Sequence, residues 1–157
     1  LRRAGAKVTL AGTVPGILKG SRNIKLVPDE ILDNIGEKEF DLIFLPGGQS
    51  CTDNLKKDKR IEKILKRMQN QGKYIAAICA APAVLKKAGI LKDKAMTCHP
   101  SVQSDFDRFV KDRVVVDEKV ITSQSPGTAM EFSLKLVEIL FGADRLKKVN
   151  DGILARI

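Results

Sequence analysis

Two short apolar runs, residues 41–45 (DLIFL) and 74–78 (YIAAI), constrain the fold of this chain more than any other feature of the sequence. Continuous apolar runs of this length are typical of parallel strands that are buried on both faces. The first run stops at Pro46-Gly47-Gly48, and the second leads through Cys79 into a helical segment at residues 82–89. Because parallel strands are joined by helical crossovers, we expect an α/β fold with a mostly parallel sheet.

The rest of the chain alternates between helical and extended patterns. Residues 54–72 carry apolar side chains at the spacing of an amphipathic helix, namely Ile61, Ile64, Leu65 and Met68. Other patterns predict strands at 6–11, 95–97, 114–116 and 120–122, an extended piece at 23–26, helices at 101–110 and 127–142, and a last helical turn at 1–4 capped by Gly5. This alternation predicts one domain, residues 1–157, built as an α/β sandwich.

The chain is strongly basic, with a net charge of +9, but its basic residues do not favour a nucleic-acid-binding protein. The densest basic group, at residues 56–67, alternates with Asp58 and Glu62 along a predicted amphipathic helix. Stacking partners for bases are scarce, because the chain has one Tyr and no Trp. We therefore favour a solvated helix face over a nucleic-acid site. No apolar run approaches the roughly 20 residues of a membrane helix, so no membrane partner is expected.

Three cysteines and a single histidine limit the chemistry of the chain. Cys51, Cys79 and Cys98 are an odd number at irregular spacing, and no Cys-x-x-Cys pair is present. One histidine cannot complete a metal site with them, so we expect no metal. Free thiols without a visible signal peptide favour a reducing cytoplasm as the location.

Three loops that follow predicted strands carry residues suited to nucleophilic catalysis. They are Pro46-Gly47-Gly48, Cys79-Ala80-Ala81 and Cys98-His99-Pro100, and the carboxyl ends of parallel strands meet at one edge of a sheet. A thiol at the start of a helix feels the positive end of the helix dipole, which favours the reactive thiolate. The backbone N–H groups of Gly48 and Ala80 could then stabilise an oxyanion. Taken singly, these features are also compatible with a core cysteine, a plain turn and a loop histidine.

Four segments resemble the ThiJ/PfpI superfamily. They are residues 41–48 (DLIFLPGG), 74–85 (YIAAICAAPAVL), 98–100 (CHP) and 122–132 (TSQSPGTAMEF), which occur in the family's order over nearly the whole chain. The branch they resemble most holds the parkinsonism-associated protein and bacterial YajL. The resemblance implies a flavodoxin-like sandwich, with helices on both faces of the sheet, that forms a homodimer and uses no cofactor.

The resemblance also implies roles for individual residues. The matching positions are the nucleophile Cys79, the oxyanion-hole amides of Gly48 and Ala80, the nearby His99, and the site neighbours Gly47, Arg22 and Pro126. Arg22 matches an arginine that the family places near its dimer interface and active site.

One family feature has no match in this chain. The family's first strand ends in a loop with a glutamate that hydrogen-bonds the cysteine, whereas Glu30, Glu37 and Glu39 stand in other contexts. We therefore expect the N-terminal strand and most of the first helix to be absent here. The loss of a central strand would leave unpaired backbone groups at a sheet edge.

The family's activities leave three functions open. The first is a glyoxalase or deglycase hydrolase, in which Cys79 attacks methylglyoxal or its glycated adducts and so protects against carbonyl and oxidative stress. The second is a non-enzymatic redox sensor or chaperone, in which Cys79 is oxidised to a sulfinate. The third is an intracellular cysteine peptidase that pairs Cys79 with His99. A small aldehyde and a second copy of the chain are the expected partners.

Overall fold

A four-stranded sheet forms the centre of the computed structural model, which describes residues 1–155. The strands follow the order β5-β6-β8-β7, with bounds β5 (Leu42–Leu45), β6 (Tyr74–Ile78), β8 (Val120–Ser123) and β7 (Val114–Asp117). β5, β6 and β8 are parallel, and β7 returns antiparallel to β8 as a hairpin. The mostly parallel sheet that the apolar runs predict is confirmed.

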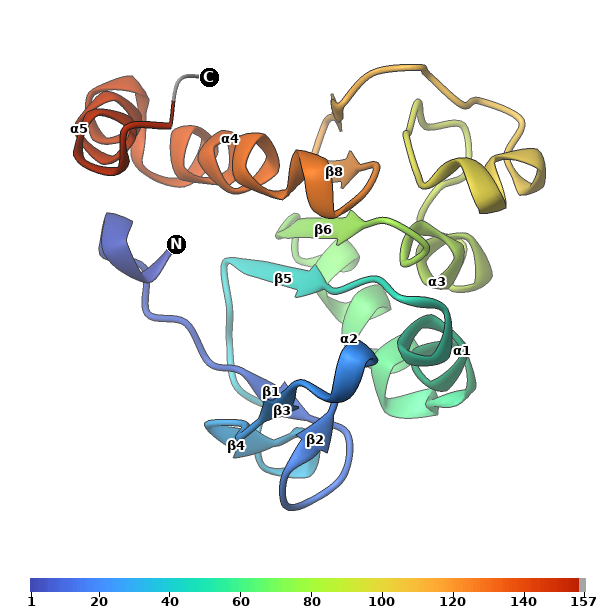
Figure 1. Cartoon of the computed structure of the whole chain (residues 1–157). Helices are drawn as coiled ribbons and strands as arrows, with labels where there is room; N and C mark the ends of the chain where they lie inside the picture. The colour runs from blue at the N-terminus through green and yellow to red at the C-terminus, as the bar shows by residue number, and fades with distance from the viewer. Residues whose placement is uncertain (156–157) are drawn as a thin grey trace.

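Helices cover both faces of this sheet (Figure 1). They are α1 (Gln49–Lys57), α2 (Lys59–Asn70), α3 (Pro82–Lys87), α4 (Ala129–Phe141) and α5 (Ala143–Ile153). The first three pack on the face that carries Ile75 and Ala77, whereas α4 packs on the face that carries Ala76 and Ile78. This division follows from the strand itself, because successive side chains point to opposite faces. α5 packs on the outside of α4.

Residues 54–72, predicted as one helix, belong to two. α1 already begins at Gln49, and α2 begins after Asp58, whose backbone is extended (φ −81°, ψ 108°). The Asp58 carboxylate accepts a hydrogen bond from the Arg60 backbone N–H at 2.9 Å and caps α2. The apolar stripe predicted for this helix is buried as expected. The prediction of a single helix was wrong, because the spacing of apolar residues does not reveal that Asp58 ends one helix and caps the next.

Small strand pairs make up the N-terminal part of the chain. β1 (Ala11–Gly12) pairs with β4 (Glu30–Ile31), and β2 (Leu18–Lys19) pairs with β3 (Lys25–Leu26). The strand predicted at 6–11 is wrong over residues 6–10, which have no strand partner within residues 1–155. The short 3-10 helices of this part are η1 (Arg2–Ala4), η2 (Ser21–Asn23) and η3 (Leu32–Asn34). Gly5 caps η1 in the left-handed region, as predicted.

The segment between β6 and the C-terminus contains two wrong predictions. The α-helix predicted at residues 101–110 is wrong. The 3-10 helix η4 (Pro100–Asp105) occupies the first half of this segment, and the backbone becomes extended at Phe106. The strand predicted at 95–97 is reduced to a single bridge between Met96 and Phe109. The predicted hairpin is confirmed, and the last predicted helix consists of η5 (Pro126–Thr128) followed by α4. No helix within the described residues is long and apolar enough to cross a bilayer.

Candidate functional site

Cys79 lies on a sharp turn between β6 and α3. Its φ angle is +65°, in the left-handed region that a residue with a side chain rarely adopts. Neighbouring loops hold the turn from both sides, because the Cys79 N–H donates to the Ser123 carbonyl and its carbonyl accepts from the His99 N–H, both at 2.9 Å. The loops that follow β6 and β8 and the loop that holds His99 therefore meet at Cys79.

Gly47 brings a fourth segment, the loop after β5, against the thiol. A Cβ atom added at Gly47 would lie 2.7 Å from the Ile78 carbonyl oxygen and 3.2 Å from the Cys79 Sγ, and it would also collide with the Cys79 Cβ. Only glycine fits at this position. The parallel pairing of β5 with β6 places the two loops side by side at one end of the sheet (Figure 1).

Two backbone N–H groups in the loops that meet at Cys79 are without a partner in the described part of the chain. Within residues 1–155, neither the Gly48 N–H nor the Ala80 N–H donates a hydrogen bond to another residue. The next amide, that of Ala81, is already used, because it donates to the Ile78 carbonyl at 3.1 Å. Gly48 precedes α1 in the left-handed region (φ +88°), and Ala80 precedes α3. Both amides therefore remain available to an anion, which keeps their predicted role open.

The ring of His99 is engaged away from the thiol. Its Nδ1 accepts a hydrogen bond from the Ser101 backbone N–H at 3.1 Å and lies 2.8 Å from the Ser101 Oγ, so the ring caps η4. Among the described residues, no hydrogen bond joins this ring to Cys79. His99 contacts the cysteine turn through its backbone N–H, and its catalytic role stays a prediction.

Arg22 and Pro126 lie at the surface. Pro126 opens η5 just after β8, in the loop that follows the Ser123 carbonyl. Arg22 sits in an exposed turn between β2 and β3 with a left-handed backbone (φ +59°). Its side chain forms no hydrogen bond or ion pair in the described part of the chain, so nothing within one copy ties it to Cys79.

The family of this chain follows from its sequence as a whole. The sequence model of the DJ-1/PfpI family matches residues 1–139. The chain belongs to the DJ-1/PfpI family. Its sequence is 40% identical to protein dj-1beta of Drosophila melanogaster over 98% of this chain and 85% of the fly protein, and 34% identical to the Parkinson disease protein 7 homologue of Danio rerio over 99% and 86%. The resemblance to the branch of the parkinsonism-associated protein is thereby confirmed.

Solved structures of DJ-1 proteins share the fold. The crystal structure of Drosophila melanogaster DJ-1beta matches with a TM-score of 0.94 at 39% identity, covering 98% of this chain and 85% of that one. The structure of oxidised Toxoplasma gondii DJ-1 also matches at 0.94, with 34% identity and the same coverage. A further relative of this DJ-1 family member is the glutathione-independent glyoxalase DJR-1.2 of Caenorhabditis elegans, 38% identical over 92% of this chain and 79% of the worm protein.

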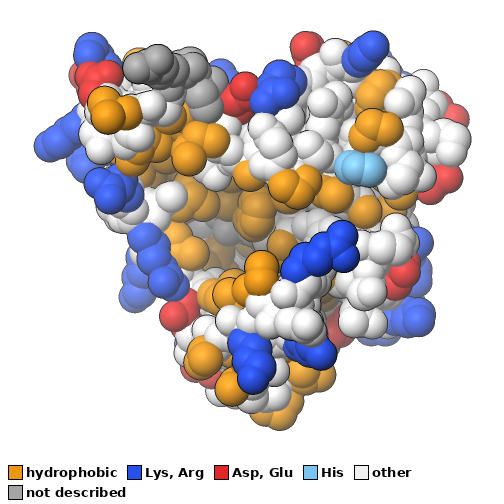
Figure 2. Space-filling model, in the orientation of Figure 1, with side chains coloured by type: hydrophobic (Ala, Val, Ile, Leu, Met, Phe, Trp, Pro, Cys, Tyr) orange, Lys and Arg blue, Asp and Glu red, His pale blue; other side chains and the backbone are white. Residues whose placement is uncertain are grey.

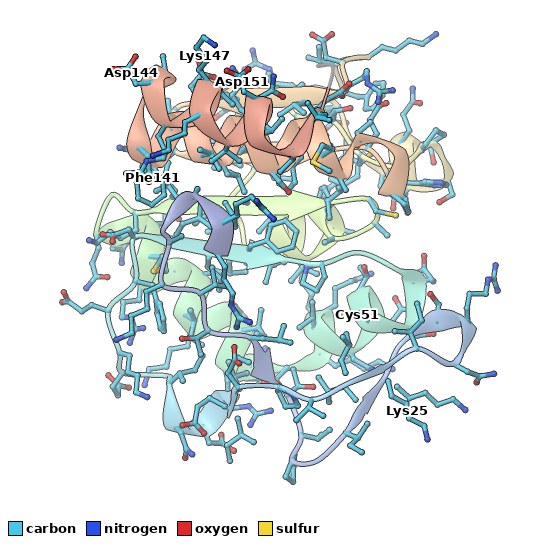
Figure 3. The ribbon with its side chains drawn as sticks, turned by 60° about the vertical axis from the view of Figure 1, so that its left-hand side comes forward. Lys25, Cys51, Phe141, Asp144, Lys147 and Asp151 are labelled. Atoms are coloured by element: carbon cyan, nitrogen blue, oxygen red, sulfur yellow. The ribbon has the colours of Figure 1, made fainter. Side chains whose placement is uncertain are left out.

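The other two thiols of this DJ-1 family member have raised pKa values. Burial, with smaller contributions from Asp105 and Cys79, raises the pKa of the Cys98 thiol to about 11. Burial also raises the pKa of Cys51, which lies on α1 (Figure 3). A thiol with a raised pKa is a poor nucleophile at neutral pH. These environments favour ordinary thiols at Cys51 and Cys98 over further nucleophiles.

Ser123 is a site residue that the sequence analysis did not single out. Its carbonyl anchors the Cys79 N–H, and its buried side chain donates to the Arg113 carbonyl at 2.8 Å and lies 2.6 Å from the Thr128 Oγ1. These bonds fix the end of β8 against the cysteine turn. The available signal was the position of Ser123 directly after the strand predicted at residues 120–122. Only the sheet order shows that this strand lies next to β6 and therefore next to Cys79.

Proposed function

We propose that this protein is a cysteine-dependent, cofactor-free hydrolase of the glyoxalase or deglycase type, acting on methylglyoxal or its adducts. The observation that carries the proposal is the left-handed turn at Cys79, with Gly47 packed on the thiol and two free amides beside it. A strained cysteine at the start of a helix, next to unpaired N–H groups, is suited to form a covalent adduct with a carbonyl. The glyoxalase name of the worm relative supports the same activity.

The proposed reaction starts with addition of the Cys79 thiolate to the aldehyde carbon. The new S–C bond leaves a negative charge on the aldehyde oxygen, and the N–H groups of Gly48 and Ala80 hydrogen-bond that oxyanion. An acid/base group then moves the proton from the first carbon to the second, which converts the hemithioacetal into a thioester. Water cleaves the thioester, so that a 2-hydroxy acid leaves and the thiol is regenerated. His99 is the acid/base candidate in this chain, through its Nε2, which forms no hydrogen bond within residues 1–155.

Lactate formation from methylglyoxal, measured without glutathione, tests this proposal. We expect the wild-type protein and the Cys51→Ser control to form lactate, and the Cys79→Ala variant to lose at least a hundredfold in kcat/KM, because it lacks the attacking atom. Equal turnover by the wild-type protein and Cys79→Ala would refute a Cys79-dependent glyoxalase.

A redox sensor is the second candidate, and the same free amides favour it. A sulfinate on Cys79 would carry its charge where the Gly48 and Ala80 amides can bind it. Peroxide treatment followed by peptide mass spectrometry should find oxidation at Cys79 before Cys51 or Cys98, whose pKa values are raised. A protein that oxidises at Cys79 but forms no lactate would be a sensor.

No observation favours the cysteine peptidase, because the His99 ring hydrogen-bonds to Ser101 instead of Cys79.

A homodimer is part of the proposal, because residues 14–27, which include the β2–β3 hairpin and Arg22, expose a set of apolar side chains. They are Val14, Ile17, Ile24, Leu26 and Val27, which are 46–74% exposed. Exposed apolar side chains concentrated in one short segment are typical of an interface. Sedimentation velocity should show a dimer, and the substitution Ile17→Lys should dissociate it.

The cytoplasmic location of the protein stays a prediction.

A further inference from the structure

Backbone hydrogen bonds on both sides of Cys98 bring this residue next to Cys79. The Thr97 N–H donates to the Thr122 Oγ1 of β8 at 2.9 Å, and the His99 N–H donates to the Cys79 carbonyl at 2.9 Å. Residues 97–99 therefore lie beside β8 and end against the cysteine turn. With standard peptide dimensions, a hydrogen bond of this length to the residue after Cys98 leaves the Cα atoms of Cys79 and Cys98 about 5–6 Å apart.

This separation of the two Cα atoms suits a disulfide. Disulfide-bonded residues have Cα atoms roughly 4.4–6.8 Å apart, most often about 5.5–6 Å. The electrostatic environment also brings the two thiols together, because the charge of Cys79 contributes to the raised pKa of Cys98. Burial alone raises the pKa of Cys51, without a contribution from either of the other thiols. The backbone spacing for a bond between Cys79 and Cys98 is therefore present, while all three cysteines are free in this structure.

The two thiols differ in their access to solvent. Cys98 is 0% exposed, whereas Cys79 is half-buried. Figure 2 shows the chain's only histidine, His99, at the surface, as expected when successive side chains of an extended segment point to opposite sides. A dissolved oxidant therefore meets Cys79 first, and the Cys98 thiol is left to react with a neighbouring group.

We infer that Cys98 is the resolving thiol of Cys79, and that the two residues form a reversible disulfide when the protein meets a peroxide. Cys98 remains a poor nucleophile towards dissolved molecules and reacts only with the adjacent sulfur. The inference rests on the reactivity of Cys79 that the proposed function also assumes, but it does not require turnover of an aldehyde.

The disulfide forms in two steps. The Cys79 thiolate attacks one peroxide oxygen, the O–O bond breaks, and water or an alcohol leaves; the sulfur gives up two electrons to the peroxide and becomes a sulfenic acid. The Cys98 sulfur then attacks the Cys79 sulfur, the S–O bond breaks, and the hydroxyl leaves as water with the proton of the Cys98 thiol. Loss of the thiolate charge also removes the contribution of Cys79 to the raised pKa of Cys98. A dithiol reductant, itself oxidised to a disulfide, regenerates both thiols.

This disulfide competes with the irreversible oxidation of Cys79 to a sulfinate. Once bonded to Cys98, the Cys79 sulfur can neither attack an aldehyde nor take up a second oxygen. Cys98 thus makes the oxidation of Cys79 reversible and switches the site off while the bond lasts.

Peptide mapping without reduction tests the inference on the wild-type protein. The protein is treated with an equimolar amount of hydrogen peroxide and then unfolded in urea with N-ethylmaleimide, which alkylates the remaining thiols. We expect a cross-linked peptide pair that joins Cys79 to Cys98 within one chain, alkylated Cys51, and loss of the cross-link after dithiothreitol. The Cys51→Ser control should give the same cross-link.

Cys98→Ser removes the resolving thiol and keeps a side chain of similar size. At the same dose of peroxide, this variant should accumulate at least tenfold more Cys79 sulfinate than the wild-type protein, and dithiothreitol should not restore its Cys79 thiol. Cys51→Ser is the matched control and should accumulate no more sulfinate than the wild-type protein. The peptide map of the wild-type protein needs no variant, so it stands even if Cys98→Ser fails to fold.

The resolving role would be overturned by a peroxide-treated wild-type protein without a Cys79–Cys98 peptide, by a cross-link that involves Cys51 instead, or by equal sulfinate in the wild-type protein and Cys98→Ser. The lactate assay is scored separately. A protein that forms this disulfide but no lactate would support the inference and refute the glyoxalase. Lactate formation without the disulfide would overturn the inference and leave the glyoxalase standing.

Discussion

Gly47→Ala is the substitution that tests the geometry of the cysteine turn most directly. The added Cβ would lie 2.7 Å from the Ile78 carbonyl oxygen, some 0.7 Å short of an ordinary contact of 3.4 Å, and it would collide with the Cys79 Cβ. The atoms it meets belong to the backbone and to the first atom of a side chain, so the loop after β5 must move away from β6. Overpacking of this kind costs about 1–3 kcal/mol.

The consequences are measurable in two independent ways. For a chain of this length, each kcal/mol lowers Tm by about 2–4 °C, so we expect a Tm about 2–12 °C below that of the wild-type protein. A displacement of the thiol relative to its amides by about 1 Å should lower kcat/KM for methylglyoxal about a hundredfold. The rate of Cys79 alkylation by iodoacetamide reports the change of environment without relying on turnover.

Gly36→Ala is the matched control, because its added Cβ meets nothing closer than the Leu32 carbonyl oxygen at 3.9 Å. It should change stability by less than about 0.5 kcal/mol and leave alkylation of Cys79 unaltered. If Gly47→Ala kept the Tm and the alkylation rate of the wild-type protein, Gly47 would not be packed against the thiol and the description of the site would be wrong.

Three further predictions concern the cap of α2, the core and the buried thiol. The Arg60 side chain, hydrogen-bonded to Asp58, lowers the pKa of that carboxyl below its ordinary value of 3.8, so Asp58→Ala should cost about 1 kcal/mol in urea unfolding at pH 7. The difference in the free energy of unfolding between the wild-type protein and Asp58→Ala should shrink as the pH falls below 3.8. The stability that a lowered carboxyl pKa provides is present above the ordinary pKa and is lost when the folded-state carboxylate is protonated. A difference that stays constant with pH would contradict the pairing of Asp58 with Arg60. Phe132→Ala removes a side chain that is 1% exposed and should cost about 3–5 kcal/mol, whereas Phe141→Ala, 40% exposed, should cost under about 1 kcal/mol in the same assay. Cys98 should resist Ellman's reagent in the folded protein and react after unfolding in urea, and rapid labelling of folded protein would show that it is accessible.

The elements that the sequence predicted well are those whose pattern is local. Residues 42–45 and 75–78 are apolar throughout, and continuous apolar runs of this length indicate strands that lie between two layers of helices. The hairpin at 114–122 was equally clear, because two β-rich runs flank a short polar turn. The strand at 6–11 had the same kind of pattern but failed over residues 6–10, because a strand exists only where a neighbour pairs with it.

The candidate site shows the same division. Cys79, its following helix and the glycines after β5 were recognisable from the chain order, and the resemblance to the DJ-1/PfpI family carried the residue types. The role of Ser123 as the anchor of the Cys79 N–H depends on the order of β6 and β8 in the sheet. The orientation of the His99 ring towards Ser101 is likewise a matter of three-dimensional packing.

The sequence by itself determined the α/β class, the family and the residue most suited to act as a nucleophile, because periodicity, turn residues and motif order are properties of neighbours along the chain. The tertiary structure decided that Gly47 touches the thiol, that the Gly48 and Ala80 amides donate no hydrogen bond within residues 1–155, and that β5 pairs in parallel with β6. These features arise between residues about 30 or more positions apart in the sequence, and their spatial relation depends on strand order and register, which no local pattern specifies.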